Sequence, residues 1–115
     1  MHENRDILIK RVLELSDIIG PSYREDRVIE YLVKEFRKTT SNVEVDNIGN
    51  INVIFKSESN PDKFITLFAH SDEIGFIIKK IENNGFIRIE RIGGVNRNIL
   101  HGTTIQFINE NSDIV

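Results

Sequence analysis

The chain of 115 residues contains no cysteine, no tryptophan and only two prolines. Without cysteine it can form no disulfide and has no thiol nucleophile. No apolar run approaches the roughly 20 residues of a membrane span, and the segment Met1–Asp6 lacks the apolar core of a signal peptide. The net charge of -3 comes without a basic stripe. We therefore expect a cytoplasmic protein that binds neither nucleic acid nor membranes.

Two amphipathic helices are expected in the first third of the chain. Apolar residues recur at helical spacing over residues 4–19, and Gly20-Pro21 should end that helix. Ser22 followed by Glu25 forms a capping-box pattern, which predicts the start of a second helix and explains both side chains structurally. The apolar stripe of this second helix consists of Val28, Ile29, Leu32, Val33 and Phe36.

The middle of the chain is predicted to form strands. Val43–Asp46 and Ile51–Phe55 flank the turn Asn47–Asn50, in which Gly49 and Asn50 suit positive φ, so we expect a hairpin. Phe64–Ala69 is apolar on both faces, which indicates a buried strand. Two helices followed by such strands predict an α/β fold with helices packed on a mixed sheet.

From Ile74 onward the chain is predicted to be all β. Ile74–Ile81, Phe86–Ile92 and Thr103–Ile108 have strand patterns, and Glu82–Gly85 ends in an Asn-Gly pair typical of a hairpin. The arginines of this region are expected to pair across strands with Glu82 or Glu90. Four aromatic side chains are interpreted as core residues: Phe64, Phe68, Phe76 and Phe86.

His70 and Asp72 follow the predicted buried strand, and strand ends are where α/β enzymes place chemistry. A neutral imidazole binds a divalent metal through one nitrogen and donates its other N–H to a carboxylate or a carbonyl. Asp72 is a candidate for that carboxylate. A His-x-Asp pair also arises by chance, and a histidine at a strand end is often only hydrogen-bonded structure. The residues alone therefore leave a metal site and a structural role open.

A complete zinc site needs three or four protein ligands. Besides His70, the histidines are His2, near the N-terminus, and His101, in a turn-like stretch. We interpret both as solvated or turn-satisfied side chains, and we assign Glu73 no catalytic role. The chain alone therefore cannot close a site for two metals.

The segment Ala69–Phe76, with the sequence AHSDEIGF, resembles the AHxDEIGF signature of the M42 family of metallo-aminopeptidases. This group also carries glutamyl aminopeptidase and endoglucanase labels. Other landmarks follow in the family's order: Gly20-Pro21-Ser22 with Glu25, Val45–Asn50, Gly85–Ile87, Ile92–Gly94 and Leu100–Gly102. The resemblance spans nearly all of this chain and only the N-terminal third of a typical member.

The resemblance implies a zinc-peptidase-like α/β domain over residues 1–74 and the truncated start of an inserted β-barrel domain over residues 75–115. It implies that His70 ligates one of two divalent metal ions, zinc or cobalt, and that Asp72 is the supporting catalytic carboxylate. The chain is then expected to be the N-terminal fragment of a dinuclear aminopeptidase that hydrolyses N-terminal residues from peptides.

In the family the general base and the other metal ligands lie downstream, so we expect the fragment alone to be inactive. The full-length form is expected to be a homo-oligomer, from a dimer to a dodecamer. The alternative is a non-catalytic assembly or interaction module derived from the same family, acting through exposed β edges or helix faces.

Overall fold

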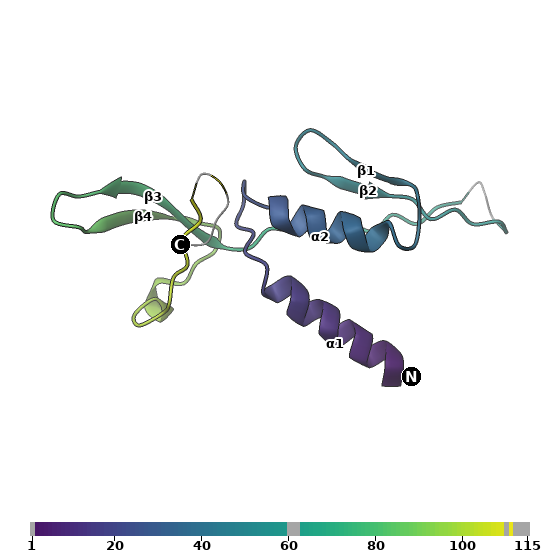
Figure 1. Cartoon of the computed structure of the whole chain (residues 1–115), viewed down its shortest axis with the longest axis horizontal. Helices are drawn as coiled ribbons and strands as arrows, with labels where there is room; N and C mark the ends of the chain where they lie inside the picture. The colour runs from purple at the N-terminus through teal and green to yellow at the C-terminus, as the bar shows by residue number, and fades with distance from the viewer. Residues whose placement is uncertain (1, 60–62, 110, 112–115) are drawn as a thin grey trace. The chain divides into compact units, whose positions relative to one another are not determined.

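The computed structural model of the chain describes residues 2–59, 63–109 and 111. It forms two compact units, residues 1–72 and residues 73–115 (Figure 1). Its helices and antiparallel strands confirm an α/β chain, and none of the helices described is long and apolar enough to cross a bilayer. The elements are α1 (His2–Ser16), α2 (Asp26–Phe36), β1 (Val43–Val45), β2 (Ile51–Val53), β3 (Gly75–Ile81), β4 (Ile87–Ile92) and the 3-10 helix η1 (Arg97–Ile99).

The first helix, α1, ends at Ser16, before the predicted stop at Gly20-Pro21. The Ser16 hydroxyl donates to the carbonyl of Val12, four residues earlier, over 2.8 Å, a local side-chain bond that serines commonly make in helices. Ile7 and Leu8, two of the apolar residues that recur at helical spacing in this helix, are 45% and 62% exposed. The helix is therefore present, but its apolar face is only partly covered by the described residues.

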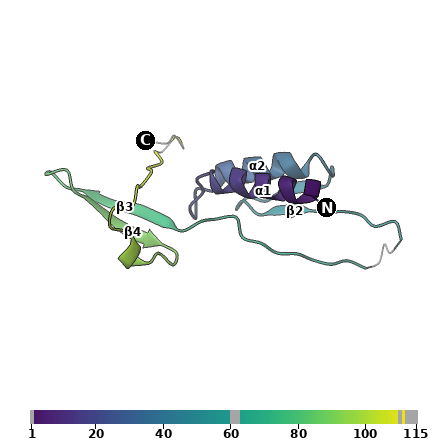
Figure 2. The same ribbon diagram turned by 90° about the horizontal axis from the view of Figure 1, so that it is seen from below.

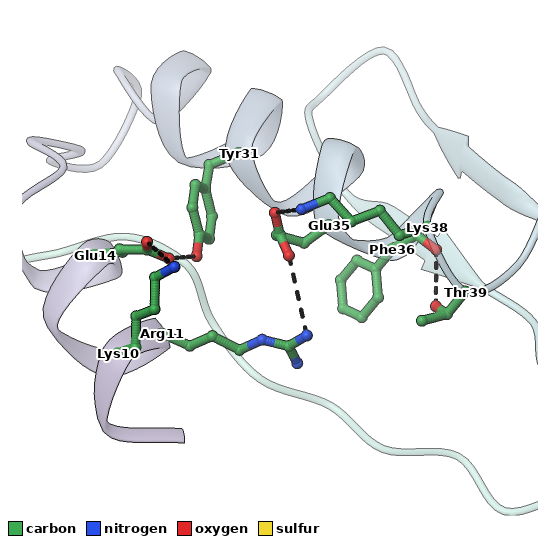
Figure 3. Close-up of polar contacts among 8 residues, drawn as sticks. All are labelled: Lys10, Arg11, Glu14, Tyr31, Glu35, Phe36, Lys38 and Thr39. Carbon is green, nitrogen blue, oxygen red and sulfur yellow. Dashed lines mark hydrogen bonds and ion pairs between the residues drawn. The ribbon is translucent and has the colours of Figure 1, made fainter. Parts of the chain in front are cut away.

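Polar side chains connect α1 with α2 (Figure 3). The Tyr31 hydroxyl donates to Glu14 Oε2 over 2.7 Å, and this hydrogen bond raises the pKa of Tyr31. Arg11 Nη2 lies 4.0 Å from Glu35 Oε2. Lys38 donates to Glu35 and lowers the pKa of that carboxyl. Exposed ion pairs of this kind contribute little to stability.

The predicted hairpin of β1 and β2 is confirmed, with Val43 opposite Val53 in an antiparallel pair. Both views place α2 beside this hairpin (Figure 1, Figure 2). Val28 in the apolar stripe of α2 is 5% exposed, and Val43 in β1 is 8% exposed. Ile29 of α2 lies close to the turn of the hairpin: a Cβ added at Gly49 would lie 2.9 Å from Ile29 Cδ1.

Asp46 organises the turn between β1 and β2. Its carboxylate accepts hydrogen bonds from the backbone N–H groups of Ile48 and Asn50 and from the Asn50 side chain. The Asn50 amide makes the largest contribution to lowering the pKa of Asp46. Gly49 has the predicted positive φ, at 90°, whereas Asn50 does not. The expectation for Asn50 was wrong: it takes part in the turn through its side chain, which donates to Asp46, and not through positive φ.

Residues 64–69 form no strand, so the predicted buried strand is wrong. Phe64, Ile65, Leu67 and Phe68 are between 89% and 91% exposed, so neither phenylalanine is a core residue. The predicted mixed sheet is wrong as well, because the described strands pair as two separate antiparallel sheets, β1–β2 and β3–β4. A buried strand needs hydrogen-bonding neighbours and covered faces, and the described residues provide this segment with neither.

The second unit contains the predicted hairpin of β3 and β4. Its turn closes with a hydrogen bond from the Gly85 N–H to the Glu82 carbonyl, and Gly85 has a φ of 86°. The register shifts at Lys79, as in a β-bulge. Arg88 pairs with Glu82 as expected, whereas the partner of Glu90 is Lys79, at 3.4 Å.

Two expectations for the second unit were wrong. Thr103–Ile108 forms no continuous strand, because within the described residues only Ile108 of this segment makes a β-bridge. Phe86 is 71% exposed and Phe76 only half-buried. The buried apolar residue here is Val95, whose carbonyl accepts a hydrogen bond from Arg91 Nη1. The assignment of residues 75–115 to a β-barrel domain stays a prediction, and residues 110 and 112–115 lie outside the described part.

Candidate functional site

His70 and Asp72 are in direct contact. His70 Nδ1 lies 3.0 Å from Asp72 Oδ1 and 3.0 Å from the main-chain oxygen of the same residue. The His70 side chain is 86% exposed and the Asp72 side chain 38%. The imidazole is therefore exposed to solvent, and its Nδ1 atom is in contact with Asp72, two residues further along the chain.

This contact determines which ring nitrogen carries the proton. Hydrogen bonds from Ser22 and then from His70 lower the pKa of the Asp72 carboxyl, so it is an anion near neutral pH. An ionised carboxylate only accepts hydrogen bonds, so His70 Nδ1 is the donor. The lone pair of the neutral ring then lies on Nε2, the nitrogen that is suited to bind a metal ion.

Ser22 joins this pair from 50 positions earlier in the sequence, where its hydroxyl donates to Asp72 Oδ2. The predicted capping box is therefore wrong. The residue before α2 is Glu25, no side chain caps that helix, and the Glu25 carboxylate accepts the backbone N–H of Tyr23 over 3.0 Å. The sequence did not indicate the contact of Ser22 with Asp72, because helix capping already explains a serine in the Ser-x-x-Glu spacing.

The turn that carries Ser22 is constrained at both ends. Tyr23 has a φ of 72°, and among the described residues it alone combines a side chain with positive φ. Gly20 is buried, and a Cβ added there would lie 2.5 Å from Val28 Cγ2. Packing of the backbone against α2 thus sets where the Ser22 hydroxyl lies.

The described residues provide one candidate metal ligand and its orienting partner. Within residues 2–59, 63–109 and 111, no three His, Asp or Glu side chains are grouped so that they could hold a metal ion. His101 is exposed in a turn, and the side chain of His2 lies outside the described part. A zinc ion needs three or four protein ligands. His70 and Asp72 fit a metal centre, whose remaining ligands would have to come from elsewhere.

Histidines that bind metal ions commonly donate their other ring N–H to a carboxylate, as His70 does to Asp72. The family model for M42 glutamyl aminopeptidase matches residues 49–115. The chain belongs to this family, which confirms the resemblance seen in Ala69–Phe76.

Known relatives carry aminopeptidase names. The glutamyl aminopeptidase of Lactococcus lactis is 30% identical over 95 residues, which cover 83% of this chain and 27% of the relative. The lysyl aminopeptidase of Pyrococcus furiosus is 26% identical over 106 residues, covering 92% of this chain and 29% of the relative. The crystal structure of an endoglucanase from Thermotoga maritima matches with a TM-score of 0.69 at 31% identity, covering 76% of this chain and 28% of that one. The chain thus spans between a quarter and a third of the length of these proteins.

Proposed function

We propose that the chain is the N-terminal part of a metal-dependent aminopeptidase, which removes N-terminal residues from peptides. The observation that carries this proposal is the contact of His70 Nδ1 with Asp72, which leaves Nε2 as the metal-binding nitrogen. Membership of the M42 family and the names of its relatives support the reaction class.

In this proposal, the residues of the chain hold and orient a metal ligand. His70 binds a divalent ion through Nε2, and Asp72 keeps Nδ1 protonated and fixes the plane of the ring. When bound, a pair of zinc or cobalt ions lowers the pKa of a water molecule and polarises the scissile carbonyl. The family resemblance implies that the general base and the other ligands would come from residues other than these 115.

The proposal also covers the context of the site. Residues 1–74 are part of the peptidase domain, and the β3–β4 hairpin supplies the first strands of an inserted β-barrel domain. The whole protein is a cytoplasmic homo-oligomer, from a dimer to a dodecamer. The family resemblance supports these statements.

Metal removal tests the proposed function. The gene product that carries this chain should hydrolyse aminoacyl p-nitroanilides, lose that activity in EDTA and regain it when zinc or cobalt is returned. The chain of 115 residues by itself should be inactive, because one ligand cannot close the site. A gene product with no metal-dependent release of N-terminal residues would refute the proposal.

The exposed segment 64–69 supports a second candidate, a non-catalytic assembly or interaction module. Its large apolar side chains, those of Phe64, Ile65, Leu67 and Phe68, are between 89% and 91% exposed, and surfaces of this kind usually mark an interaction site. A module of this kind would self-associate in sedimentation experiments and hydrolyse no peptide. The same aminopeptidase assay therefore separates the two candidates.

A further inference from the structure

We propose that Ser22 is a positioning residue of the metal site: its hydroxyl fixes the Asp72 carboxylate, which holds His70 in the orientation that binds a metal ion. This inference rests on the proposed function. It gives a role in the site to a residue whose sequence context indicates only helix capping.

Ser22 and His70 occupy opposite oxygens of the same carboxylate. Asp72 Oδ2 accepts the Ser22 hydroxyl, and Asp72 Oδ1 lies 3.0 Å from His70 Nδ1. The terminal torsion of an aspartate is broad, so a carboxylate bonded through one oxygen can rotate. A second hydrogen bond on the other oxygen restricts that rotation. Ser22 thus sets the plane of the carboxylate, and with it the direction in which the imidazole is held.

The backbone around Ser22 is arranged to hold its hydroxyl in place. Tyr23 has a φ of 72°, a conformation that costs energy for a residue with a side chain and persists only where the surroundings fix it. The Glu25 carboxylate accepts the Tyr23 N–H over 3.0 Å. On the other side, Gly20 packs against Val28. The strained turn presents the hydroxyl to Asp72 and leaves it no capping role.

The main-chain oxygen of Asp72 limits how large the effect of Ser22 can be. This oxygen also lies 3.0 Å from His70 Nδ1, so it can accept the ring proton when the carboxylate rotates away. Direct partners of metal ligands typically change metal affinity by about 10- to 100-fold, and Ser22 acts one hydrogen bond further out. We therefore expect Ser22→Ala to weaken metal binding by roughly three- to tenfold.

Cobalt binding measures this effect without relying on activity. The gene product that carries this chain is stripped of metal and titrated with cobalt(II), while the visible absorption of the bound ion is recorded. Ser22→Ala should raise the cobalt Kd, and Ser22→Thr, which keeps the hydroxyl, should restore it. Ser57→Ala is the matched control, because it removes a hydroxyl whose partner is Ser59, 3.2 Å away in an exposed connector. Thermal unfolding of all four proteins shows whether each remains folded.

The outcomes separate this inference from the proposed function. A cobalt Kd that is the same in Ser22→Ala and the unsubstituted protein would overturn the role of Ser22 and leave the proposed function intact. Equal weakening in Ser22→Ala and Ser22→Thr, with a lowered unfolding temperature in both, would show a structural role and overturn it too. No cobalt binding by the unsubstituted protein would overturn the proposed function and this inference together.

Discussion

Gly20 shows how one residue positions the candidate site. It is buried, and a Cβ there would lie 2.5 Å from Val28 Cγ2 and 3.8 Å from the Cα atom of Glu25. The close approach of the backbone to α2 therefore requires glycine at this position. The contact of Gly20 with Val28 lies at the beginning of the turn that contains Ser22.

Replacing Gly20 with alanine should destabilise the protein by about 1–3 kcal/mol, because the added methyl group forces Val28 or the turn to shift. Val28→Ala removes the atoms that the new methyl would meet. The double variant should therefore lose less stability than the two single variants added together. Urea unfolding of the four proteins measures the difference, and strictly additive losses would contradict this explanation of Gly20.

Contacts between residues that are close in the sequence could be predicted, whereas contacts between residues far apart in the sequence could not. His70 and Asp72 are two positions apart, so their contact was predictable from local geometry. The partner of Ser22 lies 50 positions away. No local pattern indicates such a partner, and the capping box offered a simpler explanation for the same residue.

At the element scale, the hairpins were predictable because turn residues act locally. Asp46 and Asn50 close the first turn through their own side chains, and Gly85 supplies positive φ in the second. Residues 64–69 were predicted wrongly because a strand depends on partners that its own sequence does not specify. The apolar character of that segment was plain, whereas the described residues provide no neighbour for it.

Gly85 and Gly94 form a matched pair of positions that isolates the contribution of backbone conformation to the free energy of unfolding. A Cβ at either would meet nothing within 4 Å, but only Gly85 has positive φ, at 86°. Gly85→Ala should therefore cost about 1–2 kcal/mol, while Gly94→Ala should be neutral or slightly stabilising. Equilibrium unfolding compares the two variants with the unsubstituted protein. Equal effects would show that the turn conformation does not stabilise the β3–β4 hairpin.

At the scale of the whole molecule, the described residues bury few apolar side chains, chiefly Val28, Val43 and Val95. The chain spans between a quarter and a third of the length of its relatives. The family was recognisable because its signature is a continuous segment, Ala69–Phe76. A metal centre is different, because its ligands are gathered from distant positions. One ligand and its partner are therefore all that this sequence indicates.

The metal content of two histidine variants tests whether His70 is a metal ligand that Asp72 orients. His70→Ala is compared with His101→Ala, which removes an exposed imidazole in a turn. Both substitutions are made in the gene product that carries this chain. The proteins are dialysed to remove unbound metal ions, and their metal content is measured by inductively coupled plasma mass spectrometry. His70→Ala should lose bound metal, and His101→Ala should keep the content of the unsubstituted protein. An unchanged metal content in His70→Ala would show that His70 does not bind the metal ion.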